Sequence, residues 1–256
     1  MKVVLLAGGA GTRISEMTEY MPKPMVEIGG MPILWHIMKE YSYYGFTDFI
    51  ICAGYKQHMI KEWFADYFLH TSDVTFDFTD GENIILHEQH TEPWKVTVVD
   101  TGLETMTGGR IRKVRKYIGN ETFMMTYGDG VCDVDIGNLV NFHKLHGKKA
   151  TLTSVKQAQS KGVLTIEGNS VRSFREKRYQ DEAVINAGYM VLEPEIIDMI
   201  DGDKTSLEAG PLEILASQGE LMSYMHSGFW QCMDTKLEHD VLQKMWDNGE
   251  APWKKW

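Results

Sequence analysis

Apolar residues in this chain gather in short continuous runs, with little polar alternation inside each run. The clearest run covers residues 3–7, and similar runs follow at 49–53, 123–127 and 150–155. Such a run is typical of a strand that is buried on both faces, as in a parallel sheet. The pattern therefore predicts a central sheet built from these segments.

Amphipathic segments lie between the predicted strands. Residues 32–45, 110–118 and 138–149 carry apolar side chains at helical spacing, with polar residues between them. Strands that alternate with helices indicate an α/β fold, in which a mostly parallel sheet has helices on both faces.

Two regions do not follow this alternation of strands and helices. Residues 71–100 contain short β-rich pieces at 73–78 and 95–100, which we interpret as hairpin-like insertions. The last third mixes strand-like runs at 163–168 and 183–192 with a helix ending near residue 249. We expect these elements to join the same sheet as substrate-binding parts, so residues 1–256 are interpreted as a single domain.

Candidate chemistry follows the first strand directly. Gly8, Gly9 and Gly11 come at the carboxyl end of that strand, where open α/β sheets usually bind ligands. Glycines let backbone N–H groups approach a ligand closely, and successive N–H groups form a concavity that binds anions. Arg13 and Lys23 add positive charge, and two prolines flank Lys23. This segment is built for a polyphosphate.

Known phosphate loops fit the segment poorly. The dinucleotide fingerprint requires a third glycine where this chain has Ile14, and the chain contains no G-x-x-x-x-G-K-[ST] string. An NAD-dependent oxidoreductase is therefore disfavoured. A noncatalytic sensor that retains the fold would be expected to lack Arg13, Lys23 or an acidic partner. A glycine-rich turn without any phosphate remains a second interpretation of the glycines alone.

Two aspartates also stand at the ends of apolar runs. Asp129 follows residues 123–127 between two glycines, a position that suits a ligand of a hard cation. It could equally be an ordinary turn aspartate. Asp234 ends the segment GFWQCMDT and could instead cap the following helix, while Asp135 is expected to cap the helix at 138–149.

Several segments together resemble the nucleoside-triphosphate:sugar-1-phosphate nucleotidyltransferases. The signature is LAGGAGTRI followed by PKPM, and the resemblance continues through residues 29–56, 92–114, 126–136, 228–235 and 251–256. The strings TMTGGR and GFWQCMDT resemble the cytidylyltransferase branch of that family.

The resemblance implies a Rossmann-like core with appended sugar-binding and oligomerisation elements. Residues 1–135 would mainly bind the nucleotide, and residues 136–256 would mainly bind the sugar phosphate. The implied reaction joins CTP and glucose 1-phosphate to give CDP-glucose and pyrophosphate. The alternative is a related nucleotidyltransferase that acts on a different phosphorylated acceptor.

The resemblance also assigns individual residues. Arg13, Lys23 and Asp129 would be catalytic, and Asp129 and Asp234 would hold Mg²⁺ as the cofactor. The nucleotide would be bound by Leu6, Ala7, Gly8, Gly9, Gly11, Thr12, Thr105, Arg110 and Gly128, with Thr105 and Arg110 around the cytosine.

Sugar-phosphate contacts are implied for Glu176, Lys177, Asn186 and Gly188. Two places depart from the family pattern: Ser160-Lys161-Gly162 stands where an Arg-Phe-Gly is usual, and Arg178 replaces a proline. These departures bear on the acceptor and not on the cytidylyl transfer.

Composition narrows the class of partners. The net charge of −10 argues against nonspecific binding to nucleic acid or to an acidic membrane, and no apolar run approaches the length of a bilayer span. Cys52, Cys132 and Cys232 include no C-x-x-C pair, and the first residues lack a signal-peptide pattern. We therefore expect reduced thiols and a cytoplasmic location, and the family resemblance implies a homo-oligomer.

Overall fold

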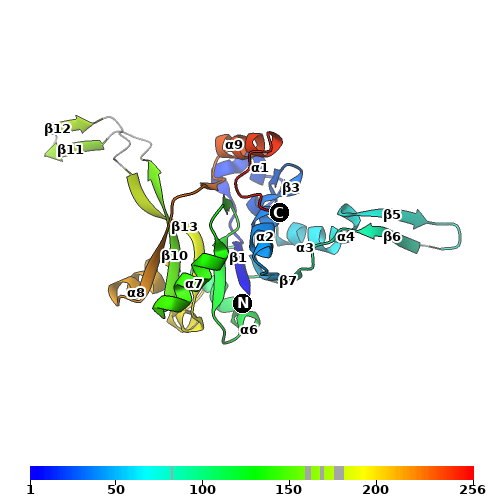
Figure 1. Ribbon diagram of the computed structural model, residues 1–256, viewed down its shortest axis with the longest axis horizontal. Coiled ribbons are helices and arrows are strands. Elements are labelled where there is room, and N and C mark those ends of the chain that lie inside the picture. Colours follow the sequence, from blue (N-terminus) through cyan, green and yellow to red (C-terminus); the bar gives the residue numbers. More distant parts are fainter. Residues whose placement is uncertain (82, 159–162, 168–169, 176–181) are drawn as a thin grey trace.

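A computed structural model describes residues 1–81, 83–158, 163–167, 170–175 and 182–256 of the chain. Among these residues, seven strands form one sheet in the order β14-β10-β13-β8-β1-β4-β7 (Figure 1). The strands are β14 (Leu221–His226), β10 (Ala150–Ala158), β13 (Glu182–Leu192), β8 (Phe123–Tyr127), β1 (Val3–Ala7), β4 (Asp48–Ala53) and β7 (Lys95–Asp100).

The sheet is mostly parallel, as the sequence predicted. β1 runs parallel to both of its neighbours, pairing Val3 with Phe49 of β4 and with Met124 of β8. β4 and β7 are parallel, and so are β10 and β14, whereas β13 runs antiparallel to β10 and β8. The chain adds β4 and β7 on one side of β1 and then places β8 on the other side. The strand order therefore reverses at β1, and the carboxyl end of such a strand is where α/β sheets usually bind ligands.

Helices cover both faces, which confirms the α/β prediction. Alternate residues of β1 enter two separate apolar cores, with Leu5 in one and Leu6 in the other. The first face is covered by α2 (Ile33–Tyr43), α7 (Ile136–His146) and α9 (Lys236–Asp247). The second is covered by α5 (Thr107–Lys113), α6 (Arg115–Ile118), η3 (Pro194–Met199), the π-helical turn η4 (Glu208–Leu212) and α8 (Glu213–Ser217).

Shorter elements complete the chain. The pair β5–β6 projects away from the sheet beyond α4 as a long hairpin (Figure 1). The remaining elements are η1 (Thr12–Ile14), α1 (Ser15–Thr18), η2 (Lys23–Met25), β2 (Glu27–Ile28), β3 (Met31–Pro32), α3 (Gln57–Ala65), α4 (Tyr67–His70), β5 (Ser72–Asp77), β6 (Asn83–Gln89), β9 (Gly130–Cys132), β11 (Val163–Glu167), β12 (Ser170–Arg175) and β15 (Trp230–Cys232).

Two local predictions were wrong, and one alternative interpretation is excluded. The segment 95–100 is no hairpin but the edge strand β7, since the exposed edge of β4 offers it a parallel partner. The helix expected over 110–118 is divided at Val114, whose φ of −97° and ψ of 6° leave helical geometry. The alternative interpretation of Asp234 as the cap of α9 is excluded, because Thr235 caps this helix in a reciprocal capping box with Glu238. The cap by Asp135 on α7 is confirmed.

In the parts of the chain that the structure describes, we find no helix with the length and apolar character needed to traverse a bilayer.

Candidate active site

A cavity of about 440 Å³ lies at the carboxyl ends of β1 and β8. Both strands point their last residues into it, because parallel strands end at the same edge of the sheet. It is lined by Leu6, Ala7, Gly8, Gly9, Gly11, Thr12, Lys23, Pro24, Thr105, Met106, Thr107, Arg110, Tyr127, Gly128, Asp129, Ser206, Glu208 and Asp234. The cavity thus brings together segments from both halves of the chain.

The glycine loop is shaped by its neighbours. A Cβ on Gly8 would lie 1.9 Å from Nη1 of Arg110, so the guanidinium occupies the room that any other residue would need. Gly11 has a φ of +63°, and the stems of Thr18 and Lys23 pack directly against it. Close packing as well as backbone freedom therefore explains these glycines.

Lys23 lies between two carboxylates. Its ammonium nitrogen is 2.7 Å from Oδ2 of Asp129 and 2.6 Å from Oδ1 of Asp234. Lys23 begins the short turn η2, with Pro22 before it and Pro24 after it, and the side chain is buried. Burial opposes the charge, but the two carboxylates more than offset it and raise the pKa of Lys23 above its ordinary value.

The donor set formed by Asp129 and Asp234 fits a hard cation. Both carboxylates contact the Lys23 ammonium at the edge of the cavity, and carboxylate oxygen is the ligand that Mg²⁺ prefers. Cys232 donates its thiol hydrogen to Oδ2 of Asp234 at 3.2 Å. Burial, reinforced by Asp234, raises the pKa of this thiol to about 12, so the sulfur stays protonated.

Arg110 joins three segments at the side of the cavity. It starts from α5, and its guanidinium donates to carbonyl oxygens of Gly8, Ala53, Gly102 and Leu103 and to the Thr101 hydroxyl, over 2.7–3.3 Å. Burial lowers the pKa of this guanidinium from its ordinary value. The arginine therefore fixes the glycine loop against the ends of β4 and β7.

The two glycines of α5 pack against the loop at residues 203–205, and the N–H of Gly109 donates to the carbonyl oxygen of Thr205 at 3.2 Å. Gly108 and Gly109 are buried, and a Cβ on either would lie within 2.8 Å of the backbone at Thr205 or Asp203. They allow α5 to approach that loop. Thr105, just before the helix, is buried and lines the cavity.

Sequence reasoning missed Glu208 and its donors. Oε2 of Glu208 accepts hydrogen bonds at 2.6 Å from the hydroxyls of Thr107 and Ser206, and Oε1 accepts one from Tyr127. Although burial raises its pKa, these donors prevail and the pKa is lowered, so the group stays ionised. The signal was weak, because a glutamate after serine and leucine reads as a helix-start residue.

A second cavity of about 200 Å³ adjoins the first. Tyr127, Asp129 and Asp234 line both, and Asn186, Ala187 and Trp230 are among the residues that line only the second. Gly188 has a φ of +85°, and a Cβ there would lie 2.4 Å from the Tyr127 ring. Its N–H bonds Oδ1 of Asn186 at 2.8 Å, so this glycine positions two side chains near the second cavity.

Some predicted site residues lie outside the described part of the chain. These are Glu176 and Lys177, together with Arg178 and the segment 160–162. The backbone of Arg13 belongs to η1, but its side chain is not among those described.

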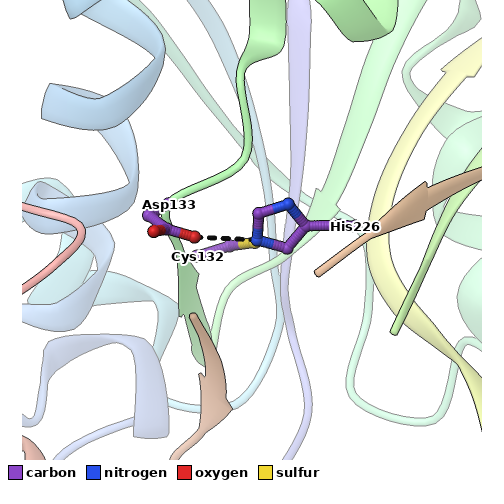
Figure 2. Close-up of side chains that lie close together, drawn as sticks. All are labelled: Cys132, Asp133 and His226. Carbon is purple, nitrogen blue, oxygen red and sulfur yellow. Dashed lines mark hydrogen bonds and ion pairs between the residues drawn. The ribbon is translucent and has the colours of Figure 1, made fainter. Parts of the chain in front are cut away.

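A different group of potential ligands, Cys132, Asp133 and His226, lies where β9 and β14 end. Figure 2 shows Asp133 and His226 facing each other with Cys132 beside them. Oδ1 of Asp133 accepts from Nε2 of His226 at 2.7 Å and from the N–H of Phe229 at 2.6 Å. These two hydrogen bonds tie Asp133 to both ends of the turn between β14 and β15, so the group has a structural role.

A glycine loop and a lysine–aspartate cluster thus lie at the switch point of a mostly parallel sheet, an arrangement that suits an enzyme acting on a nucleotide. The chain belongs to the nucleotidyl transferase family, whose sequence profile matches residues 2–235.

Individual relatives give a narrower comparison. The chain is 56% identical over 257 residues to the glucose-1-phosphate cytidylyltransferase of Salmonella typhi, with 100% of each chain covered. It is 44% identical, again over 100% of each chain, to the probable glucose-1-phosphate cytidylyltransferase of Bacillus subtilis strain 168. The crystal structure of HddC from Yersinia pseudotuberculosis complexed with GMP-PN shares the fold, with a TM-score of 0.69, 24% identity and coverage of 96% and 99% of the two chains.

Proposed function

We propose that this protein is a glucose-1-phosphate cytidylyltransferase, which joins CTP and glucose 1-phosphate to give CDP-glucose and pyrophosphate. The observation that carries the proposal is the cluster of Lys23, Asp129 and Asp234 at the junction of two adjoining cavities. Identity of 56% over the full length to a named enzyme of this activity supports the choice of substrates.

In the proposed reaction a phosphate oxygen of glucose 1-phosphate attacks the α-phosphorus of CTP in line, and pyrophosphate leaves on the opposite side. No covalent enzyme intermediate is needed, so the protein acts by positioning and by neutralising charge. The larger cavity would hold the nucleotide, with the backbone of residues 6–12 against the phosphates. Lys23 would neutralise charge at the α-phosphate, and Arg13 would bind the β- and γ-phosphates.

Asp129 and Asp234 would hold a divalent cation, for which we propose Mg²⁺. Bound there, it would offset the negative charge of the phosphate oxygens and of the leaving pyrophosphate. The chain's own contribution is the pair of carboxylates, which Lys23 and Cys232 hold in place through direct hydrogen bonds.

Cytosine selection would depend on the wall formed by Thr105, Arg110 and the glycine loop. The Arg110 guanidinium donates to backbone carbonyl oxygens, including those of Gly8 and Gly102. It would therefore act mainly by fixing the backbone segments that face the base. A site that pairs the amino group of cytosine leaves polar groups unpaired against uracil. Such a loss costs about 1–3 kcal/mol, or roughly tenfold to a hundredfold in preference.

The smaller cavity would hold the sugar phosphate. Asn186 supplies a polar group there and Gly188 fixes its surroundings, while Glu176 and Lys177 are proposed to add sugar and phosphate contacts. In this arrangement residues 1–135 mainly serve the nucleotide and residues 136–256 mainly serve the sugar phosphate.

We also propose a homo-oligomer that works in the cytoplasm. The β5–β6 hairpin exposes Phe76, Phe78, Ile84 and Ile85, with exposed fractions between 47% and 72%. A projecting hairpin with such a surface favours burial against another protein surface, and a second copy of the chain is the simplest partner.

A pyrophosphate-release assay tests the proposal, with four nucleoside triphosphates against glucose 1-phosphate and other phosphorylated acceptors. We expect turnover with CTP and glucose 1-phosphate, and CTP preferred over UTP by about tenfold or more. Lys23→Ala should lower kcat/KM roughly 10²-fold, the scale for one preorganised charge.

Lys95→Ala is the matched control, because Lys95 pairs with Asp48 on the surface, away from the cavity. Full activity of Lys23→Ala would refute the role of the cluster. Turnover of CTP with another phosphorylated acceptor, and none with glucose 1-phosphate, would replace the acceptor and keep the cytidylyl transfer.

A further inference from the structure

Lys23 occupies the point at which the two candidate metal ligands converge. Its ammonium is within 2.7 Å of an oxygen from Asp129 and within 2.7 Å of an oxygen from Asp234, and the side chain is 9% exposed. Each of these contacts is a charge-assisted hydrogen bond, among the stronger polar contacts in proteins. The lysine therefore already serves both carboxylates as their cation.

A divalent cation held by both carboxylates could not share this place with the ammonium. Mg²⁺ binds carboxylate oxygen at about 2.0–2.1 Å, so the two positive centres would compete for the same oxygens at very short separation. The ammonium has to withdraw before a metal can occupy the point between these two oxygens.

The structure provides a destination for the displaced ammonium. The Lys23 stem packs against Gly11, and the same cavity is lined by Gly8, Gly9 and Thr12 of the glycine loop. A lysine carries its charge on a flexible four-carbon stem, so rotation about its side-chain bonds can carry the head group to another partner in this cavity. A triphosphate against the loop would be such a partner.

The charges make this exchange depend on the nucleotide. Lys23 supplies one positive charge to the two negatively charged carboxylates of Asp129 and Asp234. A metal ion that arrives alone must expel the ammonium without offering it a new anion. A metal–triphosphate complex brings both the replacement cation and the replacement anion.

We propose that Lys23 is an exchangeable internal cation, which blocks the metal site until a metal–nucleotide complex arrives and then moves to the triphosphate. The proposal rests on the proposed nucleotidyl transfer for the identity of the incoming complex. Because coupling between two ligands is reciprocal, the nucleotide must raise metal affinity by the same factor as the metal raises nucleotide affinity.

Binding of Mn²⁺ tests this without any turnover. Free Mn²⁺ is measured by electron paramagnetic resonance in titrations of wild type, Lys23→Met and the surface control Lys95→Met, each without nucleotide. We expect Lys23→Met to bind Mn²⁺ about tenfold or more tightly than wild type. The metal then no longer has to break the contact between the ammonium and the carboxylates, whose Coulomb energy at hydrogen-bond distance corresponds to at least about tenfold in affinity. Lys95→Met should match wild type.

The result that overturns the proposal is Mn²⁺ binding to Lys23→Met that is as weak as, or weaker than, binding to wild type. Adding Asp129→Asn to Lys23→Met should abolish the gain, and a gain that persists would place the metal elsewhere and also overturn it. Circular dichroism checks each fold. If Lys23→Met does not fold, Lys23→Gln, which also lacks the charge, takes its place.

Wild type gives an independent readout with a non-hydrolysable CTP analogue. Water proton relaxation distinguishes Mn²⁺ in the ternary complex from Mn²⁺ bound to the analogue alone. We expect the analogue to strengthen Mn²⁺ binding in wild type and to strengthen it much less in Lys23→Met. Equal strengthening in both would refute the exchange. Failure of the CTP assay alongside this coupling would reject the substrate assignment and leave the exchange standing.

Discussion

Acid should destabilise this protein through one buried histidine. His36 on α2 is fully buried, and Nε2 lies 2.8 Å from the carbonyl oxygen of Ile28 while Nδ1 lies 3.3 Å from Nε1 of Trp253. The indole N–H can only donate, so Nδ1 accepts and Nε2 carries the proton. This pairing requires neutral imidazole, and a second proton would break the bond to Trp253.

Burial is the main cause that lowers the pKa of His36 from 6.5 to about 4, against the opposing hydrogen bonds to Ile28 and Met31. In the unfolded chain the imidazole takes up a proton below pH 6.5, whereas in the folded chain it does so only near pH 4. Stability is therefore fully present above pH 6.5 and is lost as the pH falls through this window. Linkage gives a loss of about 2 kcal/mol at pH 5 and roughly 3 kcal/mol at the lower limit.

Urea unfolding at pH 7.0, 6.0 and 5.0 measures this loss, with tryptophan fluorescence as the signal because His36 contacts the rings of Trp246, Trp253 and Trp256. His36→Gln removes the titrating group. It lowers stability at every pH, so the comparison concerns the change with pH and not the absolute value. His87→Gln is the control, because His87 is exposed and bonds only the hydroxyl of Thr75 among the described contacts.

We expect wild type and His87→Gln to lose about 2 kcal/mol more than His36→Gln between pH 7 and pH 5. Parallel losses in all three proteins would show that His36 does not contribute to acid destabilisation and would refute the reasoning.

Further predictions concern the site. Gly8→Ala should lower the free energy of unfolding, measured in urea, by more than about 1 kcal/mol, because the added Cβ would overlap the Arg110 guanidinium. Gly9→Ala is the control: no described atom lies near its Cβ, so stability should change by less than about 0.5 kcal/mol. Glu208→Gln should cost about 1–3 kcal/mol in the same assay, because one amide oxygen cannot accept all three hydroxyls; an unchanged midpoint would contradict this. Asp129→Asn should raise the Mn²⁺ or Mg²⁺ concentration needed for half-maximal pyrophosphate release at least tenfold, and wild-type behaviour would make Asp129 a turn residue.

The strands that could be predicted are those whose continuous apolar sequence fits only a strand buried on both faces. The apolar runs at β1, β4 and β8 have no polar face, and only burial on both sides satisfies them. β7 could not be predicted in the same way. Its side chains are half-buried, and its parallel partner lies more than 40 residues earlier, so its place depends on a tertiary contact.

Similar limits apply to the candidate site. The glycine loop, Lys23 and Asp129 stand beside their strands in sequence and could be placed locally. The pairing of Asp234 with Asp129 was implied by the family resemblance alone, and the contact between Asp234 and Lys23, 211 positions apart in the chain, was not predicted. The signal for Glu208 was weak, because its donors come from α5, β8 and the turn before η4, which only the folded chain brings together.

The contacts of Arg110 limit how this enzyme could be recombined with its relatives. Its guanidinium touches backbone oxygens that come from three loops, and one of these, at Gly8, also has to lack a side chain. A chimera that imports any one loop with an altered path would leave an arginine donor or a buried carbonyl unpaired. The segments around Gly8, Ala53, Gly102 and Arg110 would therefore have to be transferred together in any chimera, although more than a hundred residues separate the first from the last.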